Sequence, residues 1–135
     1  MTETDVLIIG TGFAGLCAAI KLREAGITNI RLVEKNADLG GTWYLNQYPG
    51  ATCDVASHFY SFSFAPNPNW SHLYSPQPEI LAYMNDVADR YDLRPLIDFG
   101  REVTGMTFDA ARGGWEVQFA NGAPVFARFV VNGMG

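Results

Sequence analysis

Hydrophobic and polar positions over the first 35 residues follow the order strand, glycine turn, helix, strand. The continuous apolar run from Val6 to Ile9 is typical of a buried parallel strand, and a second strand-like run covers residues 30–34. Between them, apolar residues recur at helical spacing, and Gly26 stands where such a helix would stop. The pattern predicts a βαβ unit with a parallel sheet over residues 5–35, and therefore an α/β fold.

Residues 36–78 keep neither helical nor strand periodicity for long. They are rich in glycine, proline and aromatic side chains, the last being Trp43, Tyr44, Tyr48, Phe59, Tyr60, Phe62, Phe64, Trp70 and Tyr74. A long irregular stretch inside a compact domain is uncommon and usually functional. A disordered loop is the alternative, but disordered loops are poor in aromatic residues. We therefore expect an ordered segment, anchored by burial of its rings, that wraps around a ligand.

Regular patterning returns after residue 78. Pro78-Glu79 is typical of a helix start, and one apolar face follows at Ile80, Leu81, Met84, Val87, Ala88 and Tyr91. Strand-like runs cover residues 99–108, 115–119 and 125–131, with turn signals at Gly113-Gly114 and Asn121-Gly122. The sequence thus predicts one further helix and an antiparallel β-meander.

The glycines between the first strand and the first helix have the spacing G-x-G-x-x-G of a dinucleotide site. Gly10 would allow a sharp turn, Gly12 would let the backbone approach a pyrophosphate, and Gly15 would let the helix pack closely. Glu34 ends the second strand, where a carboxylate can bind ribose hydroxyls and would repel a 2′-phosphate. The site therefore suits FAD or NAD better than NADP; the alternative is a βαβ unit whose glycines only make a tight turn.

Length, charge and cysteine usage exclude several classes of protein. The 135 residues are enough for one domain, which we take to span 1–135, and the net charge of −5 includes no basic stripe for nucleic acid. No apolar run approaches the roughly 18 residues of a membrane span. The acidic start is unlike a secretory signal, and Cys17 and Cys53 form no C-x-x-C pair, so a cytoplasmic protein is expected. His58 and His72 suggest no metal site.

Several motifs together make the sequence similar to one enzyme family over nearly its whole length. The motifs are Gly10-x-Gly12-x-x-Gly15, Glu34, Gly40-Gly41-Thr42-Trp43, Tyr48-Pro49-Gly50, Cys53-Asp54, Gln77-Pro78-Glu79-Ile80 and Ala127-Arg128-Phe129. In these motifs the chain resembles the flavin-dependent Baeyer–Villiger monooxygenases and, more loosely, the wider flavin-containing monooxygenases.

The resemblance implies an oxidoreductase that uses FAD, NADPH and O₂. Such an enzyme converts a ketone to an ester or lactone, or oxidises a heteroatom, through a C4a-peroxyflavin. The implied fold has two dinucleotide-binding domains, of which this chain would be the N-terminal FAD-binding portion. Oligomeric state and the identity of the small organic substrate do not follow from the resemblance.

The resemblance also implies roles for individual residues. The pyrophosphate would be bound by Gly10, Gly12, Phe13, Ala14 and Gly15, the adenosine ribose by Glu34 with neighbouring Lys35, and the adenine by the backbone of Val103. Gly41, Thr42, Trp43 and Tyr44 would line the flavin side, Tyr60 would also contact the cofactor, and Thr52 and Cys53 would contact NADPH. Asp54 would be the catalytic residue beside the flavin ring, although an aspartate in this position can also serve as a turn or helix cap.

The chain also departs from the family pattern. Leu45 and Gln47 replace what are often an aromatic residue and an arginine, and Met134 stands where a hydroxyl residue is usual. The sequence holds no second glycine fingerprint, no inter-domain signature, no partner arginine for Asp54 and no final strand of the FAD domain. We therefore expect the isolated chain to be an incomplete enzyme that binds FAD weakly, aggregates readily and has no monooxygenase turnover.

Three other functions compete with this interpretation. An NAD-dependent dehydrogenase would continue its strand–helix alternation after Glu34, which the irregular residues 36–78 do not. A flavin disulfide reductase would need a closely spaced cysteine pair, and there is none. A non-catalytic dinucleotide-binding fragment stays open, because the binding motifs are present here while the downstream catalytic ones are not.

Overall fold

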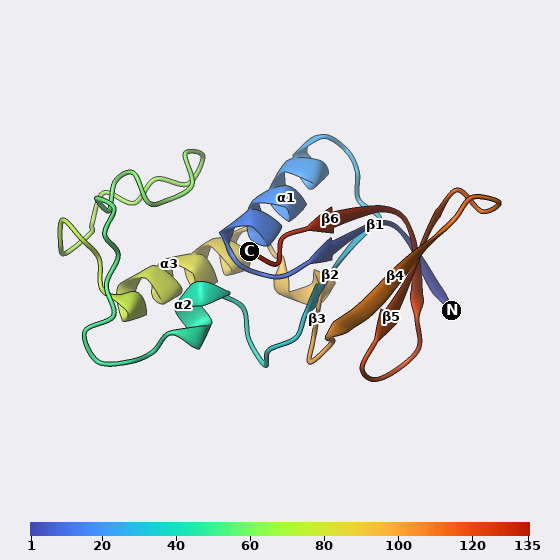
Figure 1. Cartoon of the computed structure of the whole chain (residues 1–135). Coiled ribbons are helices and arrows are strands. Elements are labelled where there is room, and N and C mark those ends of the chain that lie inside the picture. The colour runs from blue at the N-terminus through green and yellow to red at the C-terminus, as the bar shows by residue number, and fades with distance from the viewer.

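Six strands form one mixed sheet in the computed structural model, which describes residues 1–135 (Figure 1). In chain order the elements are β1 (Thr2–Ile9), α1 (Phe13–Glu24), β2 (Ile30–Glu34), α2 (Thr42–Leu45), α3 (Gln77–Arg90), the 3₁₀ helix η1 (Arg94–Leu96), β3 (Ile97–Phe99), β4 (Val103–Asp109), β5 (Gly114–Phe119) and β6 (Val125–Asn132). The predicted βαβ unit and the second long helix are both confirmed.

The strand order across the sheet is β3-β2-β1-β6-β5-β4. Strands β3, β2, β1 and β6 run parallel, whereas β5 and β4 extend the sheet as antiparallel neighbours. Central β1 pairs on both sides, with Ile8 opposite Leu32 of β2 and opposite Val131 of β6. The meander predicted from the turn signals is confirmed as β4-β5-β6, and its last strand also becomes part of the parallel sheet.

One predicted strand is wrong in its bounds. The run 99–108 divides in two, because Phe99 ends β3 at one edge of the sheet while Val103 begins β4 at the opposite edge. Gly100, with φ +68°, allows the chain to leave β3 sharply. The residues Gly100, Arg101 and Glu102 interrupt the apolar pattern at this crossing, and the predicted strand 99–108 wrongly extends across that break.

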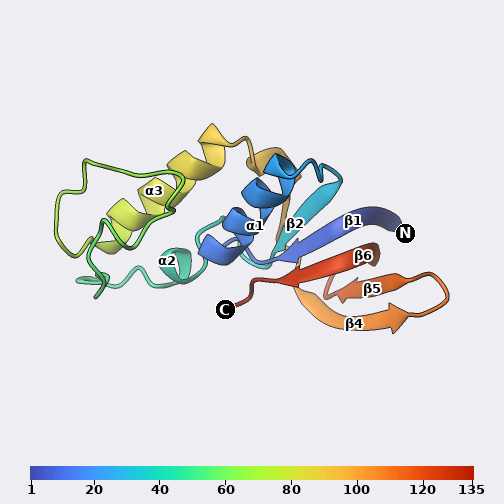
Figure 2. The same cartoon turned by 90° about the horizontal axis from the view of Figure 1, so that it is seen from above.

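Alternate residues of β1 point to two separate cores. Val6 and Ile8 belong to a large apolar cluster with α1, α3 and the irregular segment, whereas Leu7 and Ile9 pack with Val117 of β5 and other residues on the opposite face. Figure 2 shows α1 lying along one face of the parallel strands, with the β4-β5 hairpin at the sheet's far edge. A strand buried on both faces explains the continuous apolar run of the sequence.

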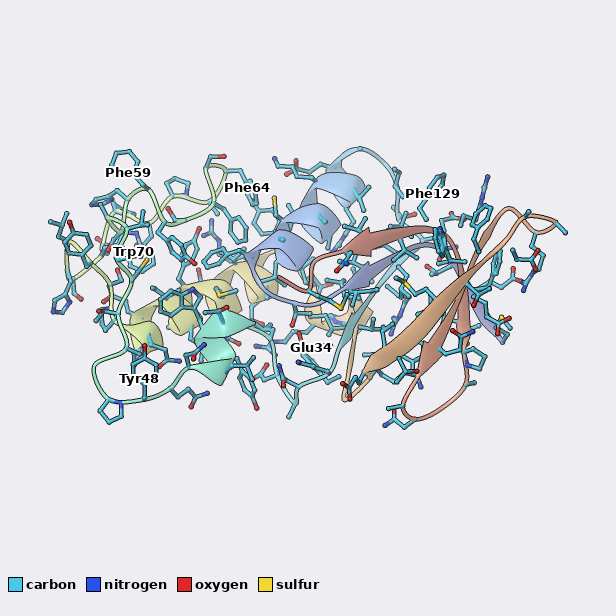
Figure 3. All side chains as sticks on the ribbon, viewed as in Figure 1. Glu34, Tyr48, Phe59, Phe64, Trp70 and Phe129 are labelled. Carbon is cyan, nitrogen blue, oxygen red and sulfur yellow. The ribbon has the colours of Figure 1, made fainter.

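Aromatic side chains anchor the irregular segment between α2 and α3, as its composition predicts. The Phe62 ring lies 5.1 Å from that of Phe13 in the glycine motif, and Phe62 itself is buried. Tyr83 of α3 adds two hydrogen bonds to this segment. Its hydroxyl donates to the Ala65 carbonyl at 2.7 Å and accepts from the Phe62 N–H at 3.0 Å. Burial raises the pKa of Tyr83. In Figure 3, Tyr48 and Phe59 instead extend outward from this segment.

The outer edge of β6 is only partly covered. Its first residues, Val125 to Ala127, pair with β5 as well as with β1, but Phe129 to Asn132 pair with β1 alone. Phe129 is 62% exposed there (Figure 3). None of the helices has the length and apolar character required to cross a bilayer.

Candidate functional site

The glycine motif links the end of β1 to the start of α1. Gly10 has φ +94°, a conformation that other residues rarely adopt, and its N–H donates to the Val33 carbonyl at 2.9 Å. A Cβ on Gly15 would lie 1.9 Å from the Gly10 carbonyl oxygen, so only glycine allows this close approach. No side chain caps α1. Its first N–H groups, together with the positive end of the helix dipole, are therefore available to an anion.

Glu34 ends β2 with a carboxylate held in one orientation. The side chain is only 5% exposed, and its Oε2 accepts from the Thr11 N–H at 3.0 Å and from the Thr11 hydroxyl at 2.7 Å. Its Oε1 accepts from the Asn36 N–H at 2.9 Å. No cation pairs with this carboxylate among the ion pairs of the structure. A carboxylate has about four acceptor positions, so capacity for a further hydroxyl donor is left.

A second glycine turn lies against the first. The Gly40 N–H donates to the Thr11 carbonyl at 3.0 Å, and a Cβ on Gly41 would come within 3.0 Å of the Gly12 Cα. Gly41 also has φ +55°, which favours glycine and allows the turn into α2. The two turns therefore approach each other with backbone alone, and no side chain fills the space beside Gly12.

Aromatic rings form a wall next to these turns. The Trp43 indole N–H donates to the Tyr60 hydroxyl at 3.0 Å, and the Tyr60 ring meets that of Phe13 edge to face at 5.2 Å between centroids. Gln77, buried at the start of α3, donates from Nε2 to the Trp43 carbonyl at 2.6 Å. The wall is thus fixed by hydrogen bonds from two other parts of the chain.

The two glycine turns, the Glu34 carboxylate and the aromatic wall border one cavity of about 390 Å³ at the carboxyl ends of β1 and β2. Ligands of open α/β sheets bind at this position. Figure 3 places Glu34 at the junction between the sheet and α2. Of the predicted site residues, the cavity is lined by Gly10, Gly12, Phe13, Ala14, Glu34, Lys35, Gly41, Thr42, Trp43, Tyr60 and Val103.

A slightly larger hollow, of about 420 Å³, lies between Pro66–Asn69 and α3. It is the weaker candidate for a cofactor site, because only two of its nine lining residues are hydrophobic and it has neither a glycine turn nor an unpaired helix start. No group of three His, Cys, Asp or Glu side chains is arranged to hold a metal ion.

Five predicted site residues do not line the cavity. Gly15 packs behind it against Gly10, and Tyr44 is a half-buried residue of α2. Thr52 forms an isolated bridge with Pro76, and Cys53 is buried in the large core. Asp54 is exposed on the irregular segment, where it neither caps a helix nor forms a hydrogen bond or ion pair.

Several residues of the cavity are not among the predicted site residues. Thr11 lies between Gly10 and Gly12, at a position that the motif leaves unspecified. Gly133 closes the cavity from β6, because its N–H donates to the Ile9 carbonyl at 2.8 Å and a Cβ on Gly10 would meet its oxygen at 2.6 Å. Arg101 also lines the cavity, but its guanidinium is bound to the carbonyls of Asn121 and Ala123 at 2.8 and 2.7 Å.

The glycine cradle fits a dinucleotide on structural grounds alone. Three backbone segments meet where added Cβ atoms would clash, a helix start faces the space, and a fixed carboxylate lies at the end of the neighbouring strand. These are the features that hold a pyrophosphate and a ribose in Rossmann-type folds.

Comparison with known proteins agrees with this geometry. The family of NAD(P)-binding Rossmann-like domains matches residues 8–76. A Baeyer–Villiger monooxygenase of Streptomyces coelicolor is 47% identical over 130 residues, which are 96% of this chain and 25% of that protein. The chain thus spans about a quarter of the length of the curated relatives it matches.

Solved structures of larger proteins contain the same fold. An oxidized steroid monooxygenase bound to NADP superposes with a TM-score of 0.94 and 46% identity, covering 99% of this chain and 26% of that one. OTEMO in complex with FAD and NADP superposes with a TM-score of 0.91 and 34% identity, over 98% of this chain and 26% of that one. The chain therefore belongs to the family of NAD(P)-binding Rossmann-like domains and corresponds to the N-terminal FAD-binding portion of the Baeyer–Villiger monooxygenases.

Proposed function

We propose that this chain binds FAD in the cavity at the carboxyl ends of β1 and β2. The observation that carries the proposal is the convergence of an uncapped helix start, a fixed Glu34 carboxylate and an aromatic wall on one space. The pyrophosphate would lie over Gly12 at the start of α1, with the adenosine ribose at Glu34. The flavin would extend toward Trp43 and Tyr60.

The other predicted site residues would form the remaining parts of the same FAD site. Gly10, Phe13, Ala14 and Gly15 would shape the pyrophosphate cradle, Lys35 and Val103 the adenosine end, and Gly41, Thr42 and Tyr44 the flavin end. Support comes from the cavity lining, which includes all of these except Gly15 and Tyr44. Gly15 and Tyr44 would pack behind the residues that line the cavity.

Electrostatics and shape favour FAD over the nicotinamide dinucleotides. A buried carboxylate that forms no ion pair accepts ribose hydroxyls and repels a 2′-phosphate, so NADP is the least suited ligand for this cavity. NAD would satisfy Glu34 equally well, but with its adenosine there the other end carries only the single nicotinamide ring, which covers less of Trp43, Tyr60 and Phe13 than a tricyclic flavin would. Among the relatives, OTEMO was solved in complex with FAD and NADP.

Within a longer protein, the proposal extends to an NADPH- and O₂-dependent monooxygenase that converts ketones to esters or lactones or oxidises heteroatoms. Bound flavin would supply the redox chemistry, and this chain would bind and orient it. Asp54 would be the catalytic carboxylate beside the flavin ring, and Thr52 and Cys53 would contact NADPH. A cytoplasmic location is part of the proposal, since both cysteines are free thiols.

Titration of the purified chain with FAD, NAD⁺ and NADP⁺ tests the binding proposal. We expect one FAD per chain, with NAD⁺ weaker and NADP⁺ weakest. The Glu34→Gln variant should bind FAD about tenfold more weakly, because it loses a charged hydrogen-bond acceptor. Glu24→Gln, an exposed substitution at the far end of α1, is the matched control and should bind normally. Preference for NADP⁺, or unchanged FAD affinity in Glu34→Gln, would contradict the proposal.

A further inference from the structure

Thr11 joins the glycine motif to the chain that follows β2. The residue is fully buried, and all three of its polar groups are used. Its N–H and its hydroxyl both donate to Glu34 Oε2, at 3.0 and 2.7 Å, while its carbonyl accepts from the Gly40 N–H at 3.0 Å. No other residue of the motif makes a side-chain hydrogen bond to the Glu34 carboxylate.

This arrangement determines where the Glu34 carboxylate lies. A glutamate side chain has several rotatable bonds, and here no lysine or arginine holds it by charge. Its orientation depends on three donors, and Thr11 supplies two of them. The hydroxyl makes the shortest of the three bonds, at 2.7 Å. Removing that hydroxyl would leave Oε2 with a single donor and would free the carboxylate to turn.

We propose that Thr11 is a positioning residue that sets the preference of this site for an adenosine ribose with free hydroxyl groups. The inference deepens the proposed function and rests on it. Thr11 needs no contact with the ligand, because it acts through the Glu34 carboxylate, which accepts the ribose hydroxyls. A site without the Thr11 hydroxyl would still bind phosphates on the glycine turn, but it would recognise the ribose poorly.

Substitutions at Thr11 can test the contribution of its side-chain hydroxyl while leaving its backbone hydrogen bonds in place. Thr11→Val keeps the side-chain shape and both backbone hydrogen bonds, and it removes only the Oγ1 donor. Thr11→Ala removes the same donor with a smaller side chain, and it serves if valine prevents folding. Thr11→Ser restores the hydroxyl. The matched control is Thr4→Val, since Thr4 is another buried threonine, 3% exposed, whose hydroxyl donates to the Asn29 carbonyl at 3.1 Å.

Two nucleotides that differ only in the ribose hydroxyls serve as probes: ADP and 2′,3′-dideoxy-ADP. Dissociation constants are measured for both by calorimetry on the full 135-residue chain, with FAD binding measured in parallel. We expect the wild type to prefer ADP by about tenfold, which is the value of one hydrogen bond to a charged group. Thr11→Val and Thr11→Ala should reduce that ratio toward one through weaker ADP binding, whereas Thr11→Ser and Thr4→Val should retain it.

A merely structural role for Thr11 would give a different result. It would weaken ADP and 2′,3′-dideoxy-ADP by the same factor and leave their ratio unchanged, and that outcome would overturn the inference. A wild type that binds FAD but does not distinguish the two probes would overturn it as well, while leaving FAD binding intact. A wild type that binds neither FAD nor ADP would overturn the proposed function together with this inference.

Discussion

Replacement of Gly12 by alanine should weaken FAD binding without lowering the free energy of unfolding. Gly12 has φ −74° and ψ −169°, which alanine adopts freely, and a Cβ there would meet no atom nearer than the Gly41 Cα at 3.8 Å. The free chain therefore accommodates the methyl group. Because alanine restricts the unfolded chain, Gly12→Ala should leave the free energy of unfolding unchanged or raise it by about 0.4–1 kcal/mol.

FAD binding by the same variant should fall strongly. The new methyl group occupies the space beside the uncapped start of α1, where the pyrophosphate must approach the backbone N–H groups. Loss of one hydrogen bond to a charged phosphate costs about 1.5–3 kcal/mol, which corresponds to about 10- to 150-fold in the dissociation constant. Urea unfolding measures the stability, and quenching of FAD fluorescence measures the affinity.

Gly15→Ala is the contrasting variant. Its Cβ would lie 1.9 Å from the Gly10 carbonyl oxygen, so α1 has to move away from β1, and both stability and binding should be lost. If Gly12→Ala binds FAD as tightly as the wild type, the pyrophosphate does not approach the backbone at Gly12. The binding geometry proposed above would then be wrong, whatever the result at Gly15.

Two further predictions concern the irregular segment. Tyr83→Phe removes the two hydrogen bonds to Phe62 and Ala65, so the free energy of unfolding should fall by about 2 kcal/mol in urea unfolding. Hydrogen bonds from Ser71, through its side chain and backbone, lower the pKa of Glu79 from the usual 4.5. The resulting stabilisation is present above pH 4.5 and is lost as the pH falls through the lowered pKa, so Ser71→Ala should destabilise the chain at neutral pH and scarcely at low pH.

Each of these variants has a control. Tyr91 is a half-buried residue whose hydroxyl makes no hydrogen bond, so the stability of Tyr91→Phe should match the wild type within about 0.5 kcal/mol. Ser63→Ala, on the exposed side of the same segment, should show no pH-dependent difference from the wild type. An equal loss in Tyr91→Phe would rule out the hydrogen-bond explanation for Tyr83. A loss in Ser71→Ala that persists at low pH would rule out ionised Glu79 as its cause.

Much of the fold was predictable because local patterns and long-range packing agree. The apolar run from Val6 to Ile9 requires burial on both faces, and the structure provides a core on each side of β1. The start of α3 at Gln77, next to Pro78, and the stop of α1 near Gly26 likewise depend on local backbone chemistry. The break after Phe99 has a local signal in Gly100-Arg101-Glu102, but the placement of β3 and β4 at opposite sheet edges depends on long-range strand pairing, which local patterning does not determine.

The candidate site was only partly predictable, because some of its residues meet only through contacts between segments that are distant in sequence. Gly12 and Glu34 follow from spacing, since a βαβ unit brings the ends of its two strands together. Thr11 and Gly133 act through contacts between segments that are distant in sequence, so no spacing identifies them. The role of Asp54 stays a prediction: within this chain the residue is exposed and lies outside the cavity.

The pairing of β1 with β6 has a consequence for how this protein folds. Ile8 lies opposite Val131, and Gly10 touches Gly133, so nearly the whole chain separates the two halves of the cofactor cradle. During synthesis, β1, α1 and β2 emerge early, but the cradle closes only when the last strand inserts beside β1. Closing such a long loop is entropically costly and slow. Flavin capture should therefore follow the insertion of β6, which would make bound FAD a direct reporter of the pairing between β1 and β6.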